Sequence, residues 1–113
     1  MNSIRSWATA TVLGATLTIH PQEIYAQAFT GADFSTWETS AQDSYIQTSL
    51  TMAGVVFSQV DPEKSACIDN WYLGEAQKAD RNTYIRNTIA EYGSYHPSGT
   101  ILAILLEACG PLN

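Results

Sequence analysis

The sequence contains few of the side chains that carry most catalytic and metal chemistry. Its 113 residues include two histidines and two cysteines, and one of the histidines, His20, lies in an N-terminal segment that we expect to be removed. One histidine and two cysteines fall short of the four ligands of a structural zinc site. A glycine-rich phosphate loop, an H-E-x-x-H motif and an EF-hand loop are also missing. We therefore expect no enzyme, no catalytic residue, no metal and no cofactor.

Basic residues are scarce as well. Five lysines and arginines face eleven aspartates and glutamates, which gives a formal net charge of −6. An excess of negative charge repels nucleic acid and anionic membrane surfaces, so we expect no nucleic-acid partner. The carboxylates favour a solvated acidic surface or a protein partner with a basic face, and their spacing singles out no catalytic pair. Glu107 is unusual because it lies in an otherwise apolar segment, and we expect it to reach water.

No apolar run reaches the length of about 20 residues that a transmembrane helix requires. The uncharged run from Trp7 to Ile19 follows Arg5 and precedes the small-residue sequence Ala26-Gln27-Ala28. A basic residue, a short apolar region and an A-x-A site are typical of a secretory signal peptide. We predict a signal peptide at residues 1–28, a single helical domain at residues 29–113, and a periplasmic or secreted location. The alternative is an amphipathic N-terminal helix that belongs to the folded domain.

Both cysteines, Cys67 and Cys109, lie in the part that we expect to be exported. An oxidising compartment and an even cysteine count predict a disulfide between them, with two free buried thiols as the alternative. Closing a loop of about 40 residues stabilises a domain by about 4 kcal/mol through chain entropy. Because so small a domain has a marginal core, we expect this bond to decide whether it folds.

Apolar residues recur at helical spacing along the exported part, and no segment alternates with the period of a strand. The clearest stripe consists of Ile46, Leu50, Ala53, Phe57 and Val60. Met52 and Val56 are expected to widen this stripe. We predict an all-α fold, a small bundle of about four helices with one disulfide.

The other helices are delimited by capping residues. Asp61 and Pro62 predict the start of a second helix, which runs to about residue 72. A third helix is expected from residue 75 or 79 to Tyr92, which lies on its buried stripe, with Gly93 as the C-cap. The last helix is expected at residues 98–108 with Ser98 as its N-cap. It is apolar nearly all round, which predicts a place at the centre of the bundle or in an oligomer interface.

Aromatic side chains are numerous for so small a domain, and they provide the candidates for a binding site. Tyrosine and tryptophan are enriched in binding hot spots, and they also fill small cores. Trp37 and Trp71 favour the core, whereas Tyr84 and Tyr95 lie off the main buried stripe and fit either role. His96 lies at the break before the last helix, where we expect it to bond nearby carbonyls. We name Tyr84, Tyr95 and His96 as candidate partner-binding residues.

Short motifs along the exported part resemble one protein family. In this chain they are Phe29-Thr30-Gly31-Ala32-Asp33-Phe34, Tyr45-Ile46, Cys67-Ile68, Tyr92 with His96-Pro97, and Ala103 through Cys109. They are similar to those of the Tai-type immunity proteins, periplasmic partners that inhibit cell-wall amidase effectors of the type VI secretion system. The resemblance implies a protein partner, namely a cell-wall hydrolase. The family usually has a further cysteine pair and a glycine after Tyr-Ile, both of which this chain lacks.

A second group of small exported proteins gives the alternative function. Stress chaperones of the HdeA type are also all-α and held by one disulfide, and acid exposes their apolar surface by protonating carboxylates. The acidic composition and the apolar last helix fit such a chaperone and also fit a homodimer, whereas Cys109 lies too close to the C-terminus for a good match. The two hypotheses are therefore a protein inhibitor and a chaperone.

Overall fold

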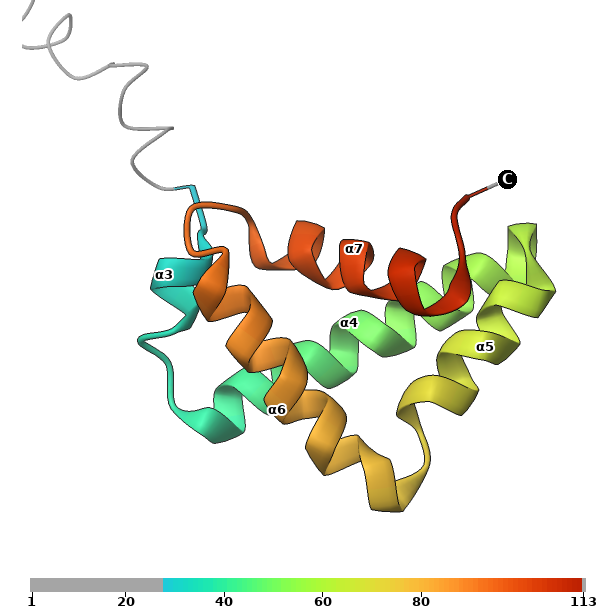
Figure 1. The fold of residues 1–113 in the computed structure, drawn as a ribbon, viewed down its shortest axis with the longest axis horizontal. Coiled ribbons are helices and arrows are strands. Elements are labelled where there is room, and N and C mark those ends of the chain that lie inside the picture. Colours follow the sequence, from blue (N-terminus) through green and yellow to red (C-terminus); the bar gives the residue numbers. More distant parts are fainter. Residues whose placement is uncertain (1–27, 113) are drawn as a thin grey trace, which may run out of the picture.

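The computed structural model describes residues 28–112, and its regular secondary structure is entirely helical (Figure 1). The helices are α3 (Gly31–Phe34), α4 (Thr39–Val60), α5 (Pro62–Tyr72), α6 (Glu75–Glu91) and α7 (Pro97–Cys109). The predicted all-α bundle with one disulfide is confirmed. The predicted signal peptide lies outside the described residues except for Ala28. Within residues 28–112 no helix combines the length and the apolar character needed to cross a membrane.

The four long helices form a bundle that α7 completes (Figure 1). α4 and α5 form a helical hairpin joined at Asp61, whose side chain accepts a hydrogen bond from the Lys64 backbone N–H at 3.2 Å. α6 then runs back toward α3, and α7 contacts α4, α5 and α6. The helix start predicted at Asp61 and Pro62 is confirmed.

The core is built from apolar side chains of all five helices. They are Phe34, Ile46, Leu50, Phe57, Ile68, Tyr72, Ile85, Ile89, Ile101, Ile104 and Leu105. α7 buries three of its residues in this core. The apolar last helix is therefore an integral part of the bundle.

Several apolar residues of α4 that the spacing placed in the core are exposed. Val60 is 73% exposed, Met52 is 60% exposed, and Val56 also faces solvent. The bundle contacts α4 along a narrow stripe that includes Gly54, where α5 approaches closely enough for Ser65 Oγ to donate to the Gly54 carbonyl at 2.8 Å. The buried residues of α4, namely Ile46, Leu50, Gly54 and Phe57, lie on one face of the helix, and the opposite face is left to solvent.

Two predicted helix caps are wrong. Ser98 does not cap α7, because Pro97 occupies the first helical position and moves the cap to His96, whose Nδ1 accepts a hydrogen bond from the Ser98 N–H at 3.1 Å. Gly93 does not cap α6, because the helix ends at Glu91, one residue earlier than predicted, and Tyr92 is the C-cap. Tyr92 is 49% exposed rather than buried, since the chain leaves the helix there.

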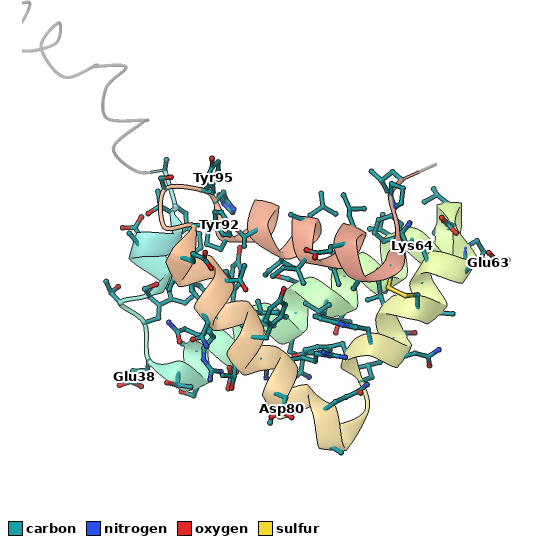
Figure 2. The ribbon with its side chains drawn as sticks, viewed as in Figure 1. Glu38, Glu63, Lys64, Asp80, Tyr92 and Tyr95 are labelled. Atoms are coloured by element: carbon teal, nitrogen blue, oxygen red, sulfur yellow. A yellow bond between two sulfur atoms is a disulfide. The ribbon has the colours of Figure 1, made fainter. Side chains whose placement is uncertain are left out.

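The C-terminal end of α7 is held by the disulfide and by a buried lysine (Figure 2). Cys67 and Cys109 are bonded as predicted, with their Cα atoms 5.8 Å apart. Lys64 is 5% exposed, and its Nζ donates to the carbonyl oxygens of Cys109, Gly110 and Pro111 at 3.2, 2.5 and 2.9 Å. Gly110 adopts a φ of 89°, which glycine accepts without strain. No sequence pattern indicated this role of Lys64.

α3 docks on the turn between α6 and α7. The Gly31 N–H donates to the Tyr95 carbonyl at 2.8 Å, and the next N–H donates to the Gly93 carbonyl at 2.9 Å. A Cβ atom on Gly31 would lie 2.5 Å from the backbone oxygen of Ile89, so this approach requires glycine. α3 therefore fixes the turn that joins the last two helices.

Candidate functional site

An open groove with a volume of about 690 Å³ lies between α6 and α7. We call it the tyrosine groove, because Tyr84, Tyr92 and Tyr95 line it together with small and acidic residues of α7. One end of it lies at the turn between the two helices, where Figure 2 shows Tyr92 and Tyr95 close together. This turn is the part of the groove that α3 fixes.

The α6 side of the groove is aromatic. Tyr84 and Tyr92 are separated by two helical turns with Thr88 between them, so they lie on one face about 12 Å apart along the axis. Both tyrosines are about half exposed, whereas Ile85 and Ile89, which follow a different face, are completely buried. Burial of these isoleucines holds α6 in the core and directs the tyrosine face toward the groove.

The turn contributes Tyr95 and His96. Tyr95 is 63% exposed, and its ring meets that of Tyr92 edge to face with the centroids 6.1 Å apart. The His96 ring packs edge to face on Phe29 at 5.5 Å, and its Nδ1 is occupied by the Ser98 N–H. The His96 ring is thus held by Phe29 and the Tyr95 ring by Tyr92, and both residues remain exposed.

A cluster of aromatic rings supports His96 from behind. Phe29 stacks on Trp37 with centroids 5.1 Å apart, and both rings also pack against Tyr45. The hydroxyl groups of Tyr45 and Ser98 are 2.6 Å apart and hydrogen-bonded, which ties α4 to the start of α7. Trp37, which we expected in the core, lies at the edge of this cluster and is partly exposed.

The α7 side of the groove is formed by small residues and, toward the end of the helix, by the carboxylate of Glu107. Gly99, Ala103 and Glu107 recur every four residues and are exposed, while Thr100 and Ile104 beside them are buried and form the floor. A Cβ atom on Gly99 would have no neighbour within 4 Å, which shows that the groove is open there. Small residues on this side leave room for an incoming chain to approach the helix.

Two carboxylates line the groove from opposite helices. Glu91 lies at the end of α6, and Glu107 lies two helical turns after Gly99 on α7. Both are exposed, as we expected for Glu107. Neither lysine nor arginine lines the groove, so its charge is negative.

All three predicted partner-binding residues, Tyr84, Tyr95 and His96, line this one groove. Sequence reasoning missed Tyr92, because its spacing from Ile85 and Ile89 predicted burial. The spacing of eight residues between Tyr84 and Tyr92 was the signal that could have placed both on one helix face. A binding role for the three predicted residues remains a prediction.

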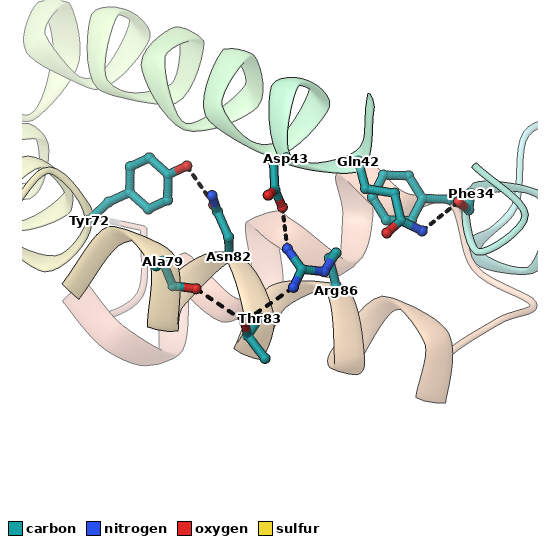
Figure 3. A network of polar contacts seen from close by, with 8 residues as sticks. All are labelled: Phe34, Gln42, Asp43, Tyr72, Ala79, Asn82, Thr83 and Arg86. Atoms are coloured by element: carbon teal, nitrogen blue, oxygen red, sulfur yellow. Dashed lines mark hydrogen bonds and ion pairs between the residues drawn. The ribbon is translucent and has the colours of Figure 1, made fainter. Parts of the chain in front are cut away.

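A second set of polar groups, which joins α6 to α4 and to α5, stabilises the fold (Figure 3). Arg86 pairs with Asp43 of α4. The buried Tyr72 hydroxyl donates to Asn82 Oδ1 at 2.6 Å. Burial raises the pKa of Tyr72, and Asp43 adds to the rise, against the effect of the hydrogen bond to Asn82. In the described part of the chain every buried side-chain polar atom has a hydrogen-bond partner, so these groups are satisfied within the fold.

Comparisons with protein-family models, curated proteins and solved structures gave no match. The functional argument therefore rests on the geometry of the tyrosine groove. Its half-exposed aromatic rings and its fixed frame suit binding.

Proposed function

We propose that this chain is a small exported protein-binding module that uses the tyrosine groove as its binding surface. The observation that carries the proposal is the exposure of Tyr84, Tyr92 and Tyr95 along one groove. Tyrosine provides a large contact area at a low cost in side-chain entropy, and it is enriched in binding hot spots. None of the three phenol groups forms a hydrogen bond with another described residue, so their polar ends are available to a partner.

The frame around the groove supports this proposal. The disulfide joins α5 to α7, Lys64 binds the end of α7, and α3 binds the turn between α6 and α7. A surface held in place before binding loses less conformational entropy when a partner docks. Such a frame suits an inhibitor that binds a folded enzyme better than a chaperone that must expose new apolar surface.

The nature of the partner follows from the family resemblance of the motifs around Gly31, Cys67 and Cys109. We propose an exported cell-wall hydrolase as the partner, and an amidase in particular, with this chain as its inhibitor. The proposal requires that the chain and the hydrolase meet in the periplasm or outside the cell.

The test compares two double variants of the exported protein. Tyr84→Ala with Tyr95→Ala removes exposed aromatic surface from the groove. Met52→Ala with Val55→Ala removes exposed apolar surface from α4, outside the groove. Partners are captured from a periplasmic extract, identified, purified and titrated by calorimetry.

We expect the tyrosine variant to lose at least tenfold in affinity for a captured hydrolase, as is typical of hot spots, while its thermal stability stays near that of the parent. The α4 variant should bind like the parent. Equal binding by both variants would refute the groove as the binding surface. Suppression of client aggregation at acid pH that depends on Met52 and Val55 instead would favour the chaperone.

A further inference from the structure

All basic side chains in the described part of the chain are engaged by other groups of the same chain. Lys64 is buried against backbone carbonyls, and Arg86 pairs with Asp43. The Arg81 guanidinium lies 4.5 Å from the centre of the Trp71 ring, and its Nε donates to the Trp71 carbonyl at 3.0 Å. The fourth, Lys78, has its Nζ 5.8 Å from the centre of the Tyr72 ring. The carboxylates of the groove are left without a basic partner among these residues.

The tyrosine groove combines the two groups that bind a basic side chain. Glu91 and Glu107 provide negative charge from opposite helices, and Tyr84, Tyr92 and Tyr95 provide aromatic faces. A guanidinium or ammonium group gains from an aromatic face within about 6 Å of the ring centre. The chain already uses this chemistry internally, where Arg81 packs on Trp71.

The dimensions of the groove suit a short peptide segment. The distance along α6 from Tyr84 to Tyr92, and along α7 from Gly99 to Glu107, is about 12 Å in each case. About four residues of extended chain cover this length. Gly99 and Ala103 have small side chains, so a peptide backbone can approach the surface of α7 at these residues.

We propose that the tyrosine groove recognises a basic peptide segment, whose arginine or lysine side chains lie against its tyrosines and beside the carboxylates of Glu91, near the turn, and Glu107, farther along α7. This inference rests on the proposed function, and it restricts the class of possible partners to proteins that carry an exposed basic segment. A second copy of this chain does not fit, because its net charge is −6 and its described basic side chains are already engaged. The favoured occupant is therefore a different, basic partner surface.

The test uses two labelled peptides with capped ends, one containing two arginines separated by an alanine, and one with citrulline in place of each arginine. Citrulline keeps the shape of the side chain and removes its charge. Binding to the exported protein is measured by fluorescence anisotropy at low and at physiological salt. We expect the arginine peptide to bind at least tenfold more tightly, with an affinity that falls as salt rises.

Two charge-matched variants separate the groove from the general charge of the protein. Glu91→Gln with Glu107→Gln should weaken binding of the arginine peptide roughly three- to thirtyfold, as expected for two exposed ion pairs. Glu38→Gln with Glu63→Gln removes the same charge far from the groove (Figure 2) and should change the affinity less than twofold. Thermal melting of both variants checks that they remain folded.

Two results would overturn the inference. One is equal affinity for the arginine and citrulline peptides. The other is an equal effect of the two charge variants, which would assign the binding to net charge alone. If a captured hydrolase depends on Tyr84 and Tyr95 but not on Glu91 and Glu107, the basic segment is refuted while the proposed function stands. If it depends on neither pair, both are refuted.

Discussion

Replacing Lys64 with methionine would remove the ammonium group that holds the end of α7 while keeping a long side chain in the same space. The Nζ of Lys64 donates to the carbonyls of Cys109, Gly110 and Pro111. These carbonyls lie at the negative end of the α7 dipole, where a cation is stabilising. The C-cap residue of α7 forms no backbone hydrogen bond back to the helix, unlike those of α4, α5 and α6. Lys64 therefore takes the place of an ordinary C-cap.

The expected loss of stability is the difference between the interactions that the ammonium group of Lys64 makes and the cost of burying it. A hydrogen bond from a charged donor contributes about 1.5–3 kcal/mol, and a cation at a partly buried helix C-terminus contributes up to about 2 kcal/mol. Burial of the ammonium group costs free energy that methionine does not lose, and the exposed Pro111 carbonyl can bind water instead. We expect the free energy of unfolding to fall by about 2–3 kcal/mol, which for a domain of this size lowers Tm by about 10–20 °C.

The assay is urea unfolding followed by circular dichroism, with the disulfide intact in every sample. Lys78→Met is the matched control, because it makes the same change of charge and shape at a partly buried lysine whose Nζ lies 5.8 Å from the centre of the Tyr72 ring and away from the end of α7. We expect this control to change the free energy of unfolding by less than about 0.5 kcal/mol. If the two variants lose equal stability, or if Lys64→Met is more stable than the parent, the capping role of Lys64 is refuted.

Two further predictions test the packing of α3 and the burial of Tyr72. Gly31→Ala should destabilise by about 1–3 kcal/mol in thermal melts, because the new Cβ would collide with backbone, whereas Gly99→Ala, whose Cβ enters open space in a helix, should stabilise by about 0.5–1 kcal/mol. Burial raises the folded pKa of Tyr72 above 10.0, so above that pH the unfolded state loses this proton first and stability falls as pH rises. In Tyr72→Phe the free energy of unfolding, measured by urea titration at a series of pH values, should no longer show this fall at alkaline pH. The same fall in the variant as in the parent would contradict the prediction.

The sequence was sufficient for the features whose signals are local. Asp61 followed by Pro62 marks a helix start wherever it occurs, because the side chain caps the free amides and the ring fits the first helical position. The disulfide followed from an even cysteine count and an expected oxidising compartment. The all-α class followed from apolar spacing alone. None of these three features depends on knowing which residues far apart in the chain are in contact in the fold.

The features that escaped prediction depend on tertiary contacts. Lys64 gave no signal because its carbonyl partners lie more than 40 residues away. Val60 and Tyr92 obey the helical spacing, but spacing alone does not show where the bundle stops covering a helix. His96 as the cap of α7 was within reach, since a proline at the first helical position places the cap one residue before it.

The same limits apply to the tyrosine groove. Tyr84 and Tyr95 were identified because they lie off the buried stripe, and this information is local. That Glu91 and Glu107 line the same groove depends on how α7 folds back over α6, which spacing does not show. Sequence alone thus identified tyrosines that line the groove but not the charge of the surface around them.

The acidity of the groove is a consequence of how the fold uses its few cations. In the described residues one lysine caps α7, one arginine joins α4 to α6, and the other two basic side chains lie against aromatic rings. The contacts of Lys64 and Arg86 satisfy these two cations within the bundle, and none of the four basic side chains lines the tyrosine groove. Within residues 28–112 no lysine or arginine lines the groove beside Glu91 and Glu107. A partner that supplies a cation would therefore gain an ion pair without breaking one that already exists, and this asymmetry favours a basic partner over another copy of the same acidic chain.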